Sequence, residues 1–381
     1  MRRLLRLILV IGVIIAATAG GLKLRYGGGG AFPQRETGAP LQDASALQRV
    51  ADLPTPPGNI AVSPAGRIFI TLHPEARPDW KVVELVKGAM RPWPSAAFQT
   101  GLGEPRAFRD VLSLRIDRQN RLWTLDTGVH GLHQPRLLAF DLDSGKVVHE
   151  FAFPRSVAGL GSHLNDFQVS PDGNWIYIAD ASFFGKNPGL VVYDVGGRRA
   201  WRALEGDASV EPDYFIPEVA GRRMELFGLI AIRPGVDSIA LDRRGDWLYF
   251  APVTDVNLHR IPSARLRDPA LTPAQRAASV EIYAPKTMSD GLSIDDADTI
   301  YISDPEHSAI VELRADGSLQ TLVRAPQLRW PDGFSFGPDG WLYVTCSSLQ
   351  NVLGRPPSSI AEHAPYQVFR IRPGGSAAPG H

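Results

Sequence analysis

The chain of 381 residues is 44% hydrophobic and 21% charged, which is enough apolar material for a large globular core. Its 40 Lys and Arg residues balance 40 Asp and Glu residues, and no basic run interleaved with aromatic residues stands out, which argues against nucleic acid as a partner. One cysteine, Cys346, excludes an intramolecular disulfide. No motif places a histidine beside this cysteine, so we expect a small buried strand residue rather than a nucleophile.

The N-terminus carries an export signal. Arg2, Arg3 and Arg6 precede an uncharged apolar run from Leu7 to Leu22, and small residues at positions 17–19 fit a cleavage site. The run is somewhat shorter than the roughly 20 residues that span a bilayer, yet long for a signal core. Residues 1–26 are therefore either a signal peptide or an N-terminal membrane anchor. Residues 27–45, with glycine at positions 27–30, are expected to form a flexible linker.

One pattern recurs along the body of the chain. It consists of two alternating strand-like runs around a Gly, Asp or Asn turn, which is typical of an antiparallel hairpin. It occurs six times, at residues 58–72, 112–126, 165–180, 237–252, 290–304 and 332–346. Most of these hairpins are followed by two further strand-like runs, so each unit predicts the four strands of one propeller blade.

The sequence therefore predicts an all-β, six-bladed β-propeller over residues 46–373, with a disordered tail at 374–381. Only one convincing strand, at 366–373, follows the last hairpin, whereas the strand-like segment 46–54 precedes the first. We expect this N-terminal strand to be the outer strand of blade six and to close the ring. Residues 205–236 form a long connection before blade four, and Thr272 followed by Pro273 predicts one short helix within that blade.

Polar residues begin the first strand of four adjacent blades, at the end that lines the central channel of a propeller. They are Asn165, Asp237, Asp290 and Asp332. Counting outward from each turn, we expect them to lie opposite Asp180, Pro252, Asp304 and Cys346. Converging carboxylates raise one another's pKa or attract a cation.

We therefore expect a site at the channel mouth, formed by these four residues. All-oxygen ligands favour Ca²⁺ or another hard divalent cation, whereas Zn²⁺ would need nitrogen, for which His163 is the nearest candidate. An organic cation such as an amine is the alternative guest, with Trp330, Phe183 or Phe184 supplying aromatic faces. The partner expected is thus a small-molecule ligand, bound by a monomer.

A structural interpretation of the same residues stands beside the functional one. An Asp before Gly can bond backbone amides at a turn, and the acids that end second strands, including Asp180 and Asp304, can cap the loops that follow. His130, His133, His163 and His307 fall on loops at the same face without metal-ligand spacing, which favours a solvent or core role. If the protein is an enzyme, Asp180, Asp304 and His163 are the candidates for a catalytic base.

Several ordered segments resemble a known family. Residues 115–128, 189–195, 237–268 and 329–350 resemble the Yellow and major royal jelly protein family, in what the sequence indicates is a bacterial member. The resemblance spans roughly residues 45–373. It implies a secreted six-bladed propeller with a central ligand pocket, and some relatives bind biogenic amines. Insect members often carry a cysteine before the RLW motif, where this chain has Gln119 and Asn120.

A weaker resemblance is to the gluconolactonase and senescence-marker propellers, which hold an axial divalent metal with Glu, Asn and Asp to hydrolyse lactones. Asn165 and Asp237 or Asp290 occupy comparable positions, whereas blade one offers Gly58 and Asn59 in place of the Glu. Three hypotheses follow: an exported protein, periplasmic or extracellular, that binds an amine or aromatic metabolite; a divalent-metal-dependent lactonase-like hydrolase or isomerase; and a non-catalytic extracellular scaffold.

Overall fold

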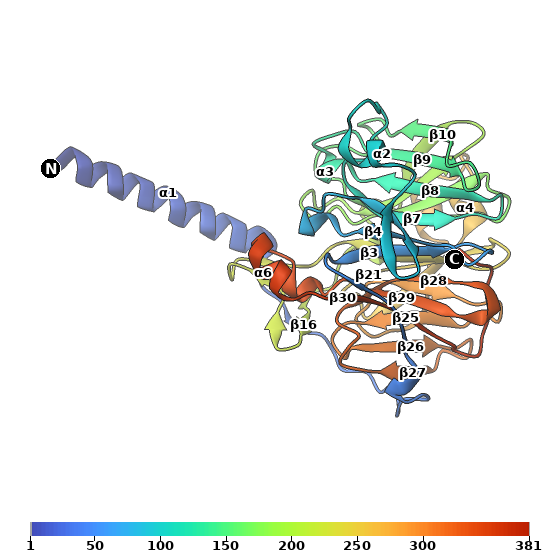
Figure 1. Cartoon of the computed structure of the whole chain (residues 1–381). Coiled ribbons are helices and arrows are strands. Elements are labelled where there is room, and N and C mark those ends of the chain that lie inside the picture. The colour runs from blue at the N-terminus through green and yellow to red at the C-terminus, as the bar shows by residue number, and fades with distance from the viewer. Residues whose placement is uncertain (1, 381) are drawn as a thin grey trace.

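The computed structural model describes residues 2–380, with only the backbone described for Asp339. Six four-stranded antiparallel sheets stand around a common axis and form a six-bladed β-propeller (Figure 1). This is the predicted fold. Blade one consists of β3 (Pro57–Val62), β4 (Ile68–Leu72), β5 (Val82–Val86) and β6 (Ala89–Pro92). Blade two consists of β7 (Val111–Ile116), β8 (Arg121–Asp126), β9 (Arg136–Asp141) and β10 (Val147–Ala152). Blade three consists of β11 (Leu164–Val169), β12 (Trp175–Asp180), β13 (Gly189–Asp194) and β14 (Arg199–Ala203).

The second half of the ring repeats this arrangement. Blade four consists of β20 (Val236–Leu241), β21 (Trp247–Pro252), β22 (Asn257–Pro262) and β23 (Glu281–Pro285). Blade five consists of β24 (Leu292–Ile294), β25 (Ile300–Asp304), β26 (Ala309–Leu313) and β27 (Leu319–Arg324). Blade six consists of β28 (Pro331–Phe336), β29 (Leu342–Cys346), β30 (Tyr366–Ile371) and β2 (Gln48–Leu53). The expected outer strand of blade six is β2, which pairs with β30. That this strand is what closes the ring stays a prediction.

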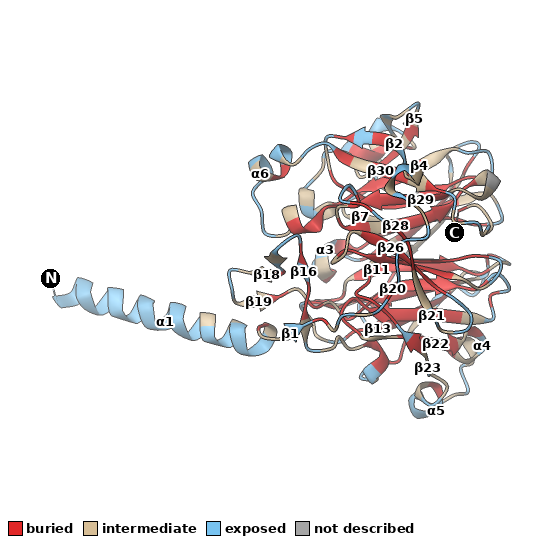
Figure 2. Ribbon diagram, turned by 90° about the horizontal axis from the view of Figure 1, so that it is seen from below, coloured by how far each residue is buried: buried red, intermediate tan, exposed pale blue. Residues whose placement is uncertain are grey.

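The core lies between neighbouring blades, because each sheet buries both of its faces (Figure 2). One apolar cluster, for example, joins Trp123 and Leu125 of β8 to Phe167 of β11 and Ile178 of β12. Cys346 is buried in such a cluster between blades five and six, as its sequence context predicts. Near the axis, side-chain hydroxyls bond the backbone of the next blade.

These hydroxyl contacts also join the last blade to the first. The hydroxyl of Thr345 in β29 donates to the carbonyl oxygen of Gly58 in β3 at 2.5 Å, and the Thr71 hydroxyl donates to the Leu112 carbonyl at 2.6 Å. The Ser238 hydroxyl donates to the Asp290 carbonyl at 2.9 Å. The inner strands are therefore held at fixed positions around the channel.

Most helices and all of the short strands lie in connections. The helices are α1 (Arg2–Tyr26), α2 (Ala96–Thr100), α3 (Gly128–Gly131), α4 (Ser263–Arg267), α5 (Pro273–Ala277) and α6 (Pro357–Glu362), and the short strands are β1 (Gly30–Ala31), β15 (Phe215–Ile216), β16 (Glu218–Val219), β17 (Arg222–Arg223), β18 (Glu225–Leu226) and β19 (Ile230–Ala231). Blade four contains two short helices rather than the one predicted. Of these, α5 has the predicted start, since Thr272 and Gln275 form a capping box.

The first helix is long enough to cross a membrane, and all but a few of its residues are exposed. It fits either a signal sequence or an anchor. The segment after it, expected to be a flexible linker, contacts the propeller in this structure: β1 pairs with β15, and Phe32 is buried. At the other end, Gly380 of the expected disordered tail donates its amide to the carbonyl oxygen of Phe336.

Candidate functional site

The inner strands begin with an irregularity at the channel mouth. In five blades a β-bulge shifts the register between the first and second strands, so that an extra residue is accommodated near the axis. In blade three, for example, Leu164 pairs with Asp180 and Phe167 pairs with Ile178. The residues that lie between paired positions at these bulges are Gly58 and Asn59, Leu112, Asn165 and Asp166, Asp237, and Asp332 and Gly333.

The bulge corrects the cross-strand pairs expected from counting residues. Asp180, Pro252 and Cys346 lie opposite Leu164, Val236 and Pro331, one residue earlier than expected in each blade. In blade five, β24 begins only at Leu292, so Asp290 lies before the paired residues of the strand. Its backbone amide donates to the Ser303 hydroxyl at 3.1 Å. The simple count fails because a bulge cannot be read from alternation alone.

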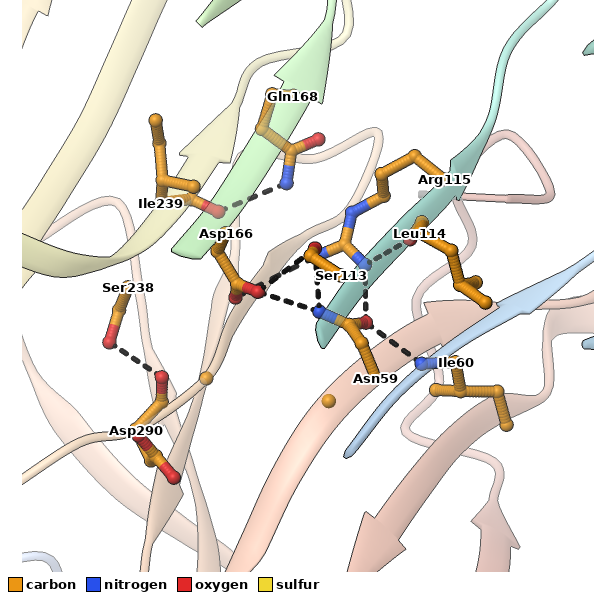
Figure 3. A network of polar contacts seen from close by, with 12 residues as sticks. Asn59, Ile60, Ser113, Leu114, Arg115, Asp166, Gln168, Ser238, Ile239 and Asp290 are labelled. Atoms are coloured by element: carbon orange, nitrogen blue, oxygen red, sulfur yellow. Dashed lines mark hydrogen bonds and ion pairs between the residues drawn. The ribbon is translucent and has the colours of Figure 1, made fainter. Parts of the chain in front are cut away.

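A buried network on the axis links blades one, two and three (Figure 3). The Asn59 side-chain amide donates to an Asp166 carboxylate oxygen at 2.7 Å, and the Ser113 hydroxyl donates to the same oxygen at 3.1 Å. Arg115 donates to the Asn59 side-chain oxygen at 2.5 Å and lies 4.0 Å from Asp166. Burial lowers the pKa of Arg115, while the charges of Asp166 and Asp332 act to raise it.

Blades four, five and six bring three further carboxylates to the same place. The indole nitrogen of Trp330 donates to an Asp290 oxygen at 2.5 Å, whereas one oxygen of Asp237 is buried without a hydrogen-bond partner among the described residues. Gly291 allows the close approach, since a Cβ there would lie 1.8 Å from the Asp332 carbonyl oxygen. Asp166, Asp237, Asp290 and Asp332 together form what we call the axial acid cluster.

The pKa values of the cluster are shifted upward. Burial raises the pKa of Asp290 to about 7, and the charge of Asp166 adds to the shift. Burial, followed by the charges of Asp290 and Asp166, raises the pKa of both Asp237 and Asp332 well above the ordinary value. Burial also raises the pKa of Asp166, although Arg115 and the bonds from Ser113 and Asn59 oppose it. These carboxyls therefore keep their protons at pH values where exposed carboxyls are charged, and a cation bound beside them would favour the charged form.

The axial acid cluster forms one end of a cavity of about 610 Å³. Apolar side chains from the mouth loops line much of its remaining wall: Leu72, Val129, Phe183, Phe184, Leu226, Ile232, Val253, Trp330, Leu349 and Leu353. All six residues predicted to bind ligand line this cavity: Asn165, Asp237, Asp290, Asp332, Trp330 and Phe183. The fold thus brings together residues from four blades that the repeat had suggested.

Three histidines line another part of the wall. The rings of His130 and His163 stack with their centroids 4.5 Å apart, and each has an Nδ1 atom without a partner among the described residues. Burial lowers the pKa of His163 to about 3, with the neighbouring histidines adding to the shift, and burial lowers the pKa of His73 to about 4. Burial also lowers the pKa of His130. These rings are neutral at pH 7.

Two of the three catalytic candidates lie outside the cavity. Asp180 accepts from the Ser162 hydroxyl and the His163 amide, both at 2.7 Å, and pairs with Arg202 at 2.5 Å. Asp304 accepts from a ring nitrogen of His307 at 2.8 Å. Both carboxylates fasten loops, as the structural interpretation expects. Of the candidate bases, His163 lines the cavity.

Sequence reasoning missed Asp166, Arg115 and His73. Asp166 follows Asn165, so only the bulge reveals that both residues reach the cavity. Arg115 lies two residues after Ser113, on the same face of β7, and reaches Asn59 near the axis. The alternation of the strand alone does not distinguish it from its neighbours. His73 follows the end of a second strand, and that position was a detectable signal because Asp180 and Asp304 stand at the same ends in other blades.

Fold and cavity together define a six-bladed propeller with an acidic axial pocket. The family model described as major royal jelly protein matches residues 110–355, and the chain belongs to that family. It is 26% identical over 194 residues to major royal jelly protein 3 of Apis mellifera, covering 47% of this chain and 33% of that protein. Major royal jelly protein 7 of Apis mellifera is 27% identical over 160 residues, covering 39% and 34%. The alignments thus span about a third of each relative's length.

Solved structures share the fold at low sequence identity. A gluconolactonase from Xanthomonas campestris superposes with a TM-score of 0.55 at 15% identity, covering 90% of this chain and 97% of that chain. A calcium-binding regucalcin from Agrobacterium tumefaciens has a TM-score of 0.54 at 15% identity, covering 87% and 95%. A luciferin-regenerating enzyme has a TM-score of 0.56 at 11% identity, covering 88% and 97%. At these identities the likeness concerns the propeller fold alone.

Proposed function

We propose that this protein is exported and that its axial pocket binds a small organic cation, an amine with an apolar or aromatic body. The single observation that carries the proposal is the buried Asp237 oxygen that lacks a hydrogen-bond partner among the described residues, next to Asp290 and Asp332. A buried carboxylate oxygen without a donor costs free energy. An ammonium group offers three donors and a positive charge at that position.

The charge balance of the axial acid cluster supports a cationic guest. Arg115 lies against Asn59 and Asp166, on the side of blades one to three, and does not line the cavity. Asp237, Asp290 and Asp332 face the cavity from the other half of the ring. A cation bound there would lower the raised pKa values of these carboxyls. The attraction between the cation and the carboxylates would be strong because the site is buried.

The apolar wall supports an organic body on that cation. A volume of about 610 Å³ is within the range of small-molecule pockets. Trp330 is bonded to Asp290 and lines the cavity, so its indole lies beside the position proposed for the ammonium group. Phe183 and Phe184, whose ring centroids lie 4.9 Å apart, line the mouth end through their loop. Aromatic faces attract a cation and stack on an aromatic ligand.

A divalent cation is the second guest that the same acids favour. Asn165, Asp237, Asp290 and Asp332 all supply oxygen, which suits Ca²⁺, and the regucalcin that shares the fold is a calcium-binding protein. Within residues 2–380, however, no group of three or more His, Cys, Asp or Glu side chains is arranged to hold a metal ion. An amine needs no such preformed ligand shell. We place the amine first because its ammonium group would meet the unpartnered Asp237 oxygen and its body would meet the apolar wall. The lactonase-like hypothesis, in which a metal would polarise a carbonyl, and the scaffold hypothesis come after it.

The test compares two ligands of the same shape. Isothermal titration of the full-length protein in detergent with phenethylamine and with 2-phenylethanol isolates the contribution of the charge. We expect the amine to bind. Asp237→Asn should weaken the affinity for the amine about 10- to 100-fold, because one charge-assisted hydrogen bond is lost. The control is Asp316→Asn, in an exposed turn of blade five.

The outcomes separate the hypotheses. Equal affinity for the amine and the alcohol, or an unchanged affinity in Asp237→Asn, would overturn the amine proposal. A parallel titration with CaCl₂ that gives stoichiometric binding, abolished in Asp237→Asn, would favour the metal-dependent alternative. Binding of neither probe would leave the scaffold reading.

A further inference from the structure

The first helix leaves the propeller at the mouth of the cavity. Its last residue, Tyr26, donates its hydroxyl to the carbonyl oxygen of Phe184 at 2.9 Å. The ammonium group of Lys186 lies 5.3 Å from the centre of the Tyr26 ring and 4.8 Å from that of Phe183. Phe183 and Phe184 both line the cavity. The end of α1 is therefore attached directly to the rim of the pocket.

The chain after α1 is also held at this face. The carbonyl oxygen of Gly27 accepts from Arg233 at 3.2 Å and from the Tyr214 hydroxyl at 3.3 Å, and Arg223 donates to the carbonyl oxygen of Gly29 at 2.8 Å. These partners belong to the long connection between blades three and four. The predicted free tether is thus replaced by contacts that restrict how far the propeller can move from the end of the helix.

The helix itself has the dimensions of a membrane span. Its 25 residues, at about 1.5 Å each, extend about 37 Å, which exceeds the roughly 30 Å of a hydrocarbon core. It contains no acidic residue, and none of its residues is buried against the propeller. Both ribbon views show it running away from the face that carries β16 and α6, whereas the C-terminus lies at the opposite face (Figures 1 and 2).

Exposed apolar side chains are concentrated on that same face. Beyond α1, ten large hydrophobic residues are exposed among the described residues. Six of them lie in loops at the mouth face: Val129, Leu132, Leu160, Phe184, Tyr214 and Phe227. The other four, Leu41, Leu102, Val148 and Ile282, lie in the N-terminal segment, after α2 or on outer strands. We call the six residues the apolar collar.

The members of the apolar collar are all exposed, from 36% for Val129 upward, and they come from different loops. Phe227 is 85% exposed and Leu160 is 74% exposed. Scattered exposed hydrophobics need no explanation, but a set confined to one face marks an interaction surface. The loops at the opposite ends of the same strands contribute none of the ten residues. Strand pairing alone would give no reason for such an asymmetry.

We propose that the apolar collar rests on a lipid bilayer in which α1 is an uncleaved anchor, so that the mouth of the cavity opens onto the lipid headgroups. The occupant is the bilayer surface, because a membrane-length helix fixed to the rim leaves from this face. Aromatic and aliphatic side chains at such an interface insert about 5–10 Å into the boundary between headgroups and acyl chains. The inference concerns orientation and does not depend on what the pocket binds.

The experiment measures the depth of labels on both faces in the full chain. Single cysteines are placed at Leu160→Cys and Phe227→Cys in the collar and at Ala315→Cys in the exposed turn of blade five, all in a Cys346→Ser background. The protein is reconstituted into phosphatidylcholine vesicles, labelled with a fluorophore and quenched by nitroxide lipids. Ala315 is the matched control, because β26 and β27 place its turn at the far ends of strands about 17–20 Å long.

We expect nitroxide lipids to reduce the fluorescence of the Leu160 and Phe227 labels about twofold or more while leaving the Ala315 label nearly unchanged, as shallow insertion of the mouth face requires. Collar variants Leu160→Asp and Phe227→Asp, which touch exposed positions only, should lower the quenching of the remaining collar label. Equal quenching at all three positions would overturn the proposal, and so would recovery of a mature chain without α1 in the soluble fraction of the host.

Discussion

The raised pKa of Asp290 makes the stability of the protein depend on pH in a way that one substitution removes. Burial and the charge of Asp166 raise this pKa from 3.8 to about 7. A shift of about three units corresponds to about 4 kcal/mol at 1.36 kcal/mol per unit. The Asp290→Asn variant keeps the shape of the side chain and an oxygen that accepts from the Trp330 indole, but it has no proton to lose.

The sign follows from the two protonation equilibria. Between pH 4 and pH 7 the folded protein keeps a proton on Asp290 that the unfolded chain has released, so the free energy of unfolding falls as the pH rises through this window. Above pH 7 the carboxyl is charged in both states and the penalty is constant. We therefore expect Asp290→Asn to match the natural protein near pH 4 and to exceed its stability above pH 7 by up to about 4 kcal/mol.

Urea unfolding of the full-length protein in a mild detergent, followed by tryptophan fluorescence between pH 4 and pH 8, measures this difference. Titrating groups remote from the axial acid cluster cancel in the comparison, whereas the pKa values of Asp237 and Asp332 fall when the Asp290 charge is removed, which adds to the difference in the same direction. Asp316→Asn is the control, because Ser318 bonds lower the pKa of Asp316 at an exposed turn. A difference between Asp290→Asn and the natural protein that does not change with pH would refute the idea of a desolvated, mutually repelling acid cluster.

Three more predictions concern the axis. Replacing Arg115 by Met leaves Asp166 without its buried cation and should lower the free energy of unfolding in urea by about 3–5 kcal/mol. The double variant that adds Asp166→Asn should be less destabilised than the single one, and equal destabilisation of the two variants would refute the pairing. Gly291→Ala should prevent normal folding, since its Cβ would meet the Asp332 carbonyl oxygen. Gly196→Ala, whose Cβ would make only an ordinary contact of 3.8 Å with the Asp194 side chain, should yield folded protein by circular dichroism. Burial raises the pKa of Cys346 to about 12, so this thiol should react with Ellman's reagent only after unfolding, and rapid reaction of native protein would contradict its burial.

How far the site could be predicted depends on the distance over which its geometry is set. Asn165, Asp237, Asp290 and Asp332 were found because each stands at the same place in a hairpin, and a hairpin is specified by residues close together in the sequence. Their common cavity followed once the repeat was recognised as a ring. The cross-strand partners were wrong by one residue, because a bulge depends on packing around the axis.

Contacts between blades were beyond a local pattern. Asn59 meets Asp166 across 107 residues of sequence, and Arg115 meets Asn59 across 56. Nothing within a single hairpin states which acid a distant guanidinium will reach, so the partial neutralisation of the cluster and the unpartnered oxygen of Asp237 appear only in three dimensions.

The sequence by itself determined the number of blades, the strands within each blade and the acids at the starts of inner strands, because alternation and turn residues act over a few positions. The tertiary structure alone decided how those acids share charge, which loops form the apolar wall, and that α1 ends at the rim of the pocket. These features arise from packing between segments far apart in the chain, where the free energy depends on burial and on distances in space that a linear pattern does not contain.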